Sequence, residues 1–274
     1  MKHLYLVTGS STGIGFAICE HLSKSGHTVL AGFRKPADKA NLLALGSGIL
    51  PIELDVTNET HLARLPTAIE SNMKGHDHFI LVNNAGVAVW GPLEETPLDD
   101  YRKQFEVNLF GSIRAIQVCL PNLRKSKGRI INISSISGLM ASPFMSPYSS
   151  SKFAMEAIAD SLRIELLNQD IKVININPGP IKTPIWNKAL ESEKAQIPNP
   201  TSRYSHQMKK FKTQIEKAVE NAPTPAAVIT ALDEAANNAN PKFNYVVGNL
   251  NIRFAIRITK FLPKRWLVYL IRRV

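Results

Sequence analysis

The chain has 274 residues, of which 44% are hydrophobic, and this suffices for one large domain with a substantial core. Its formal net charge is +11, but seven positive charges lie in residues 249–274, which leaves +4 for residues 1–248. A basic excess this modest, without a recognition motif, argues against nucleic-acid binding. The two cysteines, Cys19 and Cys119, lie among apolar neighbours and are expected to be buried free thiols, which excludes a disulfide framework.

Short apolar runs alternate with helical segments along most of the chain. They predict seven strands, near residues 4–7, 28–31, 49–54, 79–82, 130–133, 171–176 and 243–247. The alternation predicts an α/β fold: a single domain, residues 1–248, with a doubly wound parallel sheet of about seven strands. Residues 187–222 are polar and charged and are predicted to form a mobile helical lid. Thr224 and Pro225 resemble the cap and first residue of a further helix.

The segment after the first strand is rich in glycine. Residues 8–15 read T-G-S-S-T-G-I-G, and helical periodicity follows over residues 16–22. Glycines let the backbone approach a pyrophosphate closely, while the start of the helix offers free N–H groups to the anion. The spacing differs from the standard G-x-G-x-x-G fingerprint, and a plain structural turn is the alternative. The position between a strand and a helix favours nucleotide binding, as in a Rossmann-type sheet.

Tyr148 and Lys152 are separated by three serines. On a helix the two side chains lie one turn apart on one face. A free tyrosine has a pKa of about 10. A neighbouring ammonium is expected to lower that pKa, which suits the phenol to exchange a proton with an alcohol or ketone. The same spacing occurs by chance in many helices, so a surface tyrosine and a surface lysine are the alternative.

These two motifs and three further segments, in order along about residues 3–248, resemble the short-chain dehydrogenase/reductase family. Its cofactor loop is matched by Thr8, Gly9, Gly13, Ile14 and Gly15, and its N-N-A-G motif by Asn83, Asn84, Ala85 and Gly86. Its P-G-x-x-x-T segment is matched by Pro178, Gly179 and Thr183. Asn108 falls where the family has its catalytic asparagine. Ser135 lies thirteen residues before Tyr148, the usual interval for the catalytic serine, and is preferred to Ser134.

The resemblance implies an oxidoreductase with four catalytic residues. Tyr148 would exchange the proton, and Ser135 would stabilise charge on the reacting oxygen. Lys152 would also hold the nicotinamide ribose, and Asn108 would hold a water in a proton relay. The cofactor supplies the hydride, so no metal is needed. The implied cofactor contacts are Thr8, Gly9, Ser11, Gly13, Ile14, Gly15, Arg34, Asp55, Asn83, Ala85, Gly86, Tyr148, Lys152, Pro178, Gly179 and Thr183.

Cofactor choice is expected to depend on the end of the second strand. An acidic residue there binds the ribose of NAD, whereas an arginine suits the 2′-phosphate of NADP. The family's acidic position falls at Phe33, and Arg34 and Lys35 follow. We therefore predict NADP(H) in preference to NAD(H). The alternatives are an unselective enzyme with a solvated loop, or an NAD enzyme that works mainly as an oxidant. Asp55, after the third strand, would contact the adenine.

The segments that surround the nicotinamide end are mostly apolar. They are residues 138–145, residues 87–90 and Trp186. Such a pocket suits a steroid, a retinoid or another lipophilic alcohol or ketone. The alternative is that these residues only pack the lid.

The seven histidines include one cluster, His76-Asp77-His78, in the loop before the predicted fourth strand. No third ligand has suitable spacing, so we interpret this cluster as a solvated loop and expect no metal site.

Residues 249–274 form a basic amphipathic tail. Arg253, Arg257, Lys260 and Lys264 have helical spacing, and Trp266 begins a run of six apolar residues, far short of the roughly 20 that span a bilayer. The tail suits a membrane interface. Packing over the pocket or against a partner subunit is an equal alternative.

The leading hypothesis is an NADP(H)-dependent reductase or dehydrogenase of lipid metabolism. We expect a cytoplasmic homodimer or homotetramer with possible peripheral membrane contact through residues 249–274; the first strand starts almost at once, without a signal peptide. The second hypothesis is a catalytically silent dinucleotide sensor or membrane-tethered scaffold.

Overall fold

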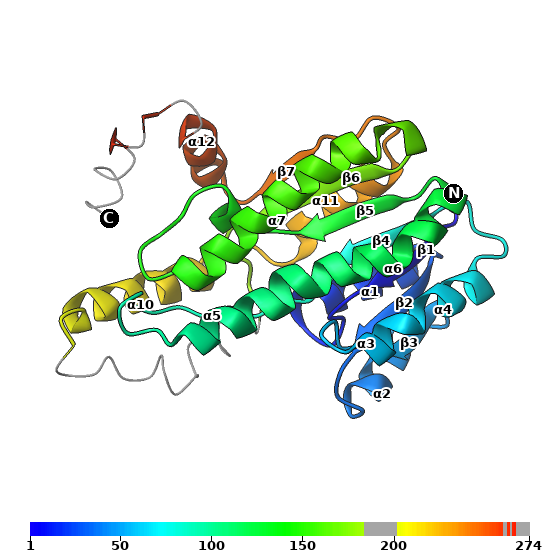
Figure 1. The fold of residues 1–274 in the computed structure, drawn as a ribbon, viewed down its shortest axis with the longest axis horizontal. Helices are drawn as coiled ribbons and strands as arrows, with labels where there is room; N and C mark the ends of the chain where they lie inside the picture. The colour runs from blue at the N-terminus through cyan, green and yellow to red at the C-terminus, as the bar shows by residue number, and fades with distance from the viewer. Residues whose placement is uncertain (184–201, 260–261, 264, 267–274) are drawn as a thin grey trace.

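The computed structural model describes residues 1–183, 202–259, 262–263 and 265–266. Within them the chain forms a seven-stranded parallel sheet of order β3-β2-β1-β4-β5-β6-β7 (Figure 1). The strands are β1 Leu4–Val7, β2 Thr28–Phe33, β3 Ile49–Glu53, β4 Phe79–Asn83, β5 Arg129–Ile133, β6 Lys172–Pro178 and β7 Asn244–Val247. The predicted doubly wound, Rossmann-type sheet is therefore confirmed.

The strands from β1 to β6 contribute to two cores, because successive side chains face opposite sides of the sheet. In β1, Tyr5 and Val7 pack in one cluster, and Leu4 and Leu6 pack in the other. Both faces are covered by helices, so the strands are almost continuously apolar and could be predicted from sequence.

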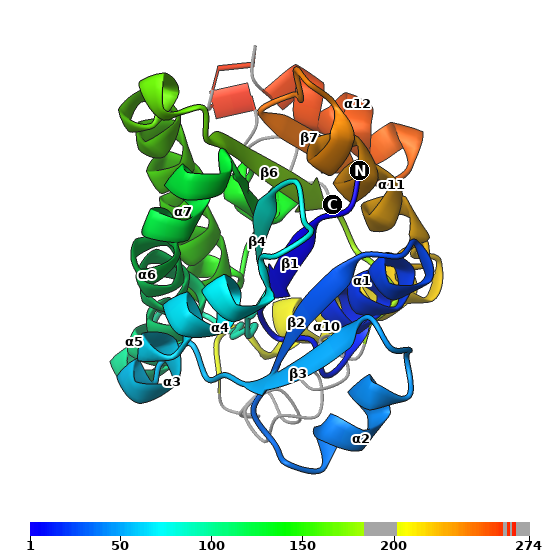
Figure 2. The ribbon, with the colours of Figure 1, turned by 90° about the vertical axis from the view of Figure 1, so that its right-hand side faces the viewer.

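The helices lie in two layers (Figure 2). One layer contains α1 Gly13–Lys24, α2 Asp38–Leu43 and α11 Ala226–Asn237. The other contains α3 Glu59–Ala63, α4 Leu65–Asn72, α5 Leu98–Phe105, α6 Gly111–Ser126 and α7 Ser146–Glu165. The cysteines Cys19 in α1 and Cys119 in α6 are buried and free, as predicted.

Several element boundaries differ from the sequence predictions by one or two residues. The strand β6 extends to Pro178, which pairs with Val247, although the apolar run ends earlier. The helix α11 has Pro225 as its N-cap, so the predicted cap at Thr224 is wrong by one residue. The reason is that the Pro225 carbonyl already accepts the N–H of Val228 at 2.8 Å.

Two helices lie near the carboxyl end of the sheet, where the predicted lid and tail begin. The helix α10 spans Ser205–Glu220, within the predicted lid, and α12 spans Leu250–Thr259 (Figure 1). The rest of the lid (187–201), Trp186 and parts of the tail lie outside the described residues. Among the helices that the structure describes, none is both long enough and apolar enough to cross a bilayer.

Candidate active site

The glycine turn after β1 adopts a conformation that suits only glycine. Gly9 and Gly13 have φ values of +67° and +62°, in the left-handed region that side chains disfavour. A Cβ on Gly9 would lie 2.8 Å from Cα of Ala85, and a Cβ on Gly15 would lie 2.4 Å from Nδ2 of Asn84. The glycines therefore let the turn pack directly on the segment that follows β4.

Hydrogen bonds join these two segments. Thr8 Oγ1 accepts the N–H groups of Asn84 at 3.0 Å and Ala85 at 2.9 Å. In return, Asn84 Nδ2 donates to the carbonyls of Thr8 and Gly9, both at 2.9 Å. The carboxyl ends of β1 and β4 are thus held together at the position where the strand order reverses, which is where ligands bind in open α/β sheets.

A cavity of about 400 Å³ opens at this position. Of the residues predicted from sequence, it is lined by Gly9, Ser11, Gly13, Ile14, Arg34, Asp55, Ala85, Gly86, Asn108, Ser135, Tyr148, Lys152, Pro178, Gly179 and Thr183.

Three predicted cofactor residues, Thr8, Gly15 and Asn83, are not among the lining residues. They lie behind the wall, and Asn83 donates its amide to Asn132 of β5 instead. Its neighbour Asn84 lines the cavity, so the sequence pattern identified the motif but not which asparagine faces the cavity.

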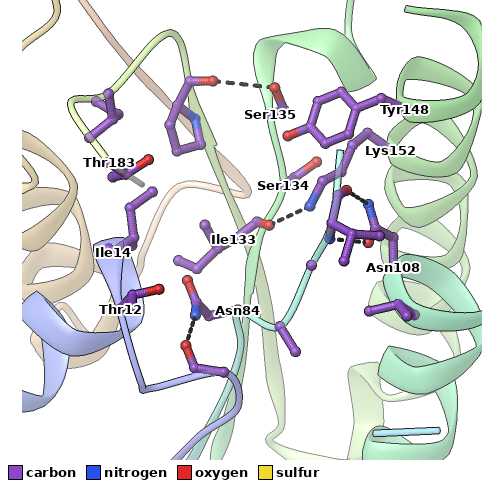
Figure 3. A pocket seen from close by; sticks show the side chains of 18 of the residues that line it. Thr12, Ile14, Asn84, Asn108, Ile133, Ser134, Ser135, Tyr148, Lys152 and Thr183 are labelled. Carbon is purple, nitrogen blue, oxygen red and sulfur yellow. Dashed lines mark hydrogen bonds between the residues drawn. The ribbon is translucent and has the colours of Figure 1, made fainter. Parts of the chain in front are cut away.

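Tyr148 and Lys152 lie on the first turns of α7 and face the cavity (Figure 3). Their one-turn spacing on a helix is confirmed. Nζ of Lys152 lies 5.8 Å from the centroid of the Tyr148 ring and donates to the Ile133 carbonyl at 2.8 Å. The lysine therefore touches both the end of β5 and the tyrosine.

The pKa of Tyr148 shifts in the opposite direction from the sequence expectation. Burial raises the pKa of the phenol, and a hydrogen bond with Ser135 lowers it by less. Burial likewise lowers the pKa of Lys152 to about 8, against a rise from the charge of Glu156. In the protein alone, desolvation of the phenolate outweighs the hydrogen bond with Ser135.

Ser135 is fixed by its local structure. It is the N-cap of a short 3₁₀ helix, η2 (Ile136–Gly138), and its Oγ accepts the N–H of Ser137 at 3.1 Å. The same hydroxyl donates to the Pro178 carbonyl at 3.4 Å (Figure 3). Both Ser134 and Ser135 line the cavity, and the hydrogen bond with Tyr148 distinguishes Ser135.

Asn108 lies in a π-helical turn, η1 (Glu106–Phe110), between α5 and α6. Such turns are frequent at functional sites. Its amide accepts the N–H of Val87 at 2.8 Å and donates to the Val87 carbonyl at 3.0 Å. Gln104, which the sequence analysis missed, accepts the N–H of Val89 at 2.7 Å and is fully buried. The two amides hold the backbone beside the cavity.

The far end of the cavity, away from Tyr148, is lined by both positively and negatively charged side chains. Arg34 lies 4.0 Å from Asp55, with 61% of the arginine side chain exposed. Burial raises the pKa of Asp55, but hydrogen bonds from Thr57 and the charge of Arg34 hold it below its ordinary value. Lys35 and Asp38 also line this end, and the sequence analysis had not considered Asp38.

The His76-Asp77-His78 segment lies at the amino end of the sheet, away from the cavity. His76 Nε2 hydrogen-bonds Thr28 Oγ1 at 2.9 Å, and His78 Nδ1 hydrogen-bonds the Ser126 carbonyl at 2.8 Å. The histidines thus tie this loop to the start of β2 and the end of α6 rather than extending into solvent. Within the described part of the chain, no group of three or more side chains could hold a metal ion.

A glycine turn at the switch point of the sheet, beside a paired tyrosine and lysine, defines an oxidoreductase of the dinucleotide-binding class. The family model of the short chain dehydrogenases matches residues 3–194. The chain therefore belongs to the short-chain dehydrogenase/reductase family, as its motifs had suggested.

Similar proteins include two reductases and a solved structure. The chain is 37% identical over 255 residues to the NADPH-dependent 3-dehydrocapnine reductase of Ornithobacterium rhinotracheale, covering 91% of this chain and 89% of the relative. It is 30% identical over 270 residues to the 3-ketodihydrosphingosine reductase of Bacteroides thetaiotaomicron, covering 98% and 96%. A short-chain dehydrogenase of Burkholderia cenocepacia in complex with NADP has a TM-score of 0.70 and 27% identity, covering 92% of this chain and 90% of that one.

Proposed function

We propose that this protein is an NADP(H)-dependent oxidoreductase that interconverts a hydrophobic secondary alcohol and its ketone, or an alcohol and its aldehyde. The observation that carries the proposal is the meeting of Tyr148, Lys152 and Ser135 at one wall of a cavity whose opposite wall is the glycine turn. Neither feature alone implies this chemistry, and together they supply a proton donor beside a dinucleotide cradle.

The residues present fit a dinucleotide. Any side chain on Gly9 would collide with the Ala85 backbone, so the turn keeps its close approach only with glycine. The first N–H groups of α1 follow this turn and are free to bind phosphate. When bound, the nicotinamide supplies or accepts the hydride.

The side chains around the reacting oxygen supply proton transfer and charge stabilisation. Tyr148 gives a proton to the carbonyl oxygen in reduction and takes one from the hydroxyl in oxidation. Ser135 donates a hydrogen bond to the same oxygen as its negative charge develops. Lys152 presents a cation behind the phenol and holds the ribose, and Asn108 would keep a water in line behind the lysine to replace the proton.

The preference for NADP(H) rests on charge at the far end of the cavity. Arg34 and Lys35 follow β2 where an NAD enzyme needs an acidic residue, and an arginine binds a phosphate bidentately. The similarity to an NADPH-dependent reductase and to a structure solved with NADP supports the same choice. Asp38 and Asp55 reduce the positive potential there.

A lipophilic substrate is proposed from the lining at the nicotinamide end. Among the described residues, that end carries no charge besides Lys152, and its apolar members are Val87, Ile136, Met145, Ile181, Phe211 and Ile215. Phe211 of α10 lies with its ring 5.5 Å from those of Trp90 and Phe144. A mostly apolar pocket end, with Phe211 backed by two further aromatic rings, favours a long apolar substrate over a sugar or a small acid. The similarity to a ketodihydrosphingosine reductase agrees with this proposal.

We also propose that the C-terminal segment touches a membrane surface. Phe254 is 67% exposed and Trp266 is 61% exposed, and the exposed Arg253 and Arg265 lie close to them in sequence. Aromatic and basic side chains together suit an anionic lipid interface. Cytoplasmic location and a homo-oligomeric state stay predictions from sequence.

A Tyr148→Phe variant tests the enzymatic proposal. NADPH absorbance is followed against a panel of lipophilic ketones and aldehydes, and NADPH binding is measured by fluorescence. We expect the variant to bind NADPH as wild type does and to lose turnover by roughly a hundredfold or more, because the proton donor is gone. Unchanged turnover, or NADPH binding without turnover of any compound by wild type, would favour the sensor hypothesis.

A further inference from the structure

A row of asparagines crosses half of the sheet. Asn83 of β4, Asn132 of β5, Asn175 of β6 and Asn244 of β7 occupy consecutive partner positions across four strands. The first three are at most 5% exposed. Buried amides are almost always hydrogen-bonded, so the amides of this asparagine row are expected to have hydrogen-bond partners.

From Asn83 to Asn175, the hydrogen bonds of the asparagine row run in one direction. Nδ2 of Asn83 donates to Oδ1 of Asn132 at 2.9 Å, and Nδ2 of Asn132 donates to Oδ1 of Asn175 at 2.9 Å. Nδ2 of Asn175 then donates to Oε2 of Glu156 at 2.7 Å. A carboxylate only accepts hydrogen bonds. Glu156 therefore fixes the orientation of Asn175 and, through it, of the two amides behind.

Glu156 is itself buried, with an exposure of 8%. Its carboxylate accepts two further hydrogen bonds, from Asn177 Nδ2 at 2.6 Å and from Asn244 Nδ2 at 3.0 Å. A buried carboxylate is costly unless it is both hydrogen-bonded and paired with a cation. The three amides supply hydrogen bonds to the carboxylate. Because they are uncharged, they supply no compensating positive charge.

Lys152 precedes Glu156 by one turn of α7, so its positive charge lies on the same face of the helix as the carboxylate. A Cβ on Gly138 would lie 3.0 Å from the Lys152 carbonyl oxygen and 3.1 Å from Cγ of Glu156, so η2 packs closely over both residues. Tyr148 is a second titratable side chain beside Lys152, and β5 contributes the Ile133 carbonyl. Burial lowers the pKa of Lys152, and the charge of Glu156 opposes that change.

The same network reaches the serine. Asn177 Nδ2, which donates to Glu156, also lies 3.3 Å from the Ser135 carbonyl oxygen. The main chain of Ser135 and the carboxylate beside Lys152 thus share one amide.

We propose that Glu156 is a positioning residue that keeps the Lys152 ammonium charged in the protein interior, and that the asparagine row holds its carboxylate in place. The proposal rests on the catalytic role given above to Lys152. It adds a residue that touches neither substrate nor cofactor and acts through the lysine.

The test is an NMR titration of the full-length protein labelled with ¹³Cε-lysine, in which the Lys152 signal is assigned by its loss in Lys152→Met. In wild type the Lys152 signal is expected to titrate near pH 8. Glu156→Gln should lower that midpoint by about one pH unit or more, a roughly tenfold loss of proton affinity, because the opposing charge is removed.

Glu156→Asp guards against misfolding, since it keeps the charge but withdraws it by one methylene. It should lower the midpoint by less, in the same direction. Glu165→Gln, an exposed change on the same helix, is the matched control and should leave the midpoint unchanged.

An unchanged Lys152 midpoint in whichever Glu156 variant folds would overturn the proposal. The readout needs no substrate, so it is independent of the enzymatic test. A shifted midpoint in a protein without turnover would leave the charge coupling standing while removing the proposed function.

Discussion

At Tyr148, burial and hydrogen bonding act in opposite directions on one hydroxyl group. Burial raises the pKa of the phenol, and Ser135 lowers it. The spacing Y-x-x-x-K predicted that tyrosine and lysine share a helix face, and they do. It could not predict the net direction of the pKa, because burial depends on the strands and loops that pack around α7, and no local pattern encodes them.

Arg34 is the residue at which cofactor selectivity can be tested. Arg34→Ala should weaken NADPH binding about tenfold and leave NADH binding nearly unchanged, because the guanidinium would bind the 2′-phosphate that NADH lacks. Fluorescence titration with both cofactors measures the effect. Lys39→Ala, an exposed cation nearby that does not line the cavity, is the control. Equal NADPH affinity in wild type and Arg34→Ala would remove this residue from cofactor selection.

Among the elements, α10 contributes one aromatic ring to a cluster whose other rings come from two separate loops. Phe211 meets Trp90, from the loop after β4, and Phe144, from the loop before α7. Each ring could be noted in the sequence as apolar. Their meeting could not be predicted, because three segments far apart in the chain supply them.

A Phe211→Ala variant tests whether α10 forms part of the substrate wall. We expect the KM for a lipophilic ketone to rise about tenfold or more, since roughly 1.5–3 kcal/mol of apolar burial is lost. NADPH affinity should stay at the wild-type value. Thr213→Ala, an exposed position on the same helix, serves as the control. Equal KM values in wild type and Phe211→Ala would mean that the substrate does not reach this helix.

The asparagine row shows what sequence reading misses at the level of strands. Each strand was predicted within two residues of its observed ends, because apolar runs reveal buried strands directly. An asparagine inside such a run only becomes meaningful once the register aligns it with asparagines of neighbouring strands. Register depends on the whole sheet, so neither the row nor its terminus at Glu156 was anticipated.

For the whole molecule, the order of motifs along the chain was enough to predict the architecture. Alternating strands and helices leave few arrangements for a parallel sheet. The substrate end was less predictable, because its lining combines residues from β4, β5, β6, α7 and α10 and their loops. Residues 184–201 lie outside the described part of the chain, so the prediction for Trp186 is untested.

Membrane contact is a property of the whole molecule and is tested by sedimentation with vesicles. The full-length protein should pellet with vesicles that contain phosphatidylserine, and less so at high salt, because basic residues are attracted to the anionic surface. Removal of residues 249–274, or the single change Phe254→Asp, should reduce the bound fraction about tenfold. Leu167→Asp, at an exposed apolar residue outside this segment, should have no effect. A wild-type protein that stays in the supernatant would contradict the proposal.

The strand order has a consequence for how such a protein can be altered. The chain builds β1, β2 and β3 outward from the centre on one side, then returns to build β4 to β7 on the other. Residues 33–38, beside Arg34, therefore belong to a stretch separate from the one that carries Ser135, Tyr148 and Lys152. Under the proposed function, coenzyme preference and reaction chemistry depend on consecutive, non-overlapping parts of the polypeptide, so a graft of the first part should change one property while the residues of the other stay intact.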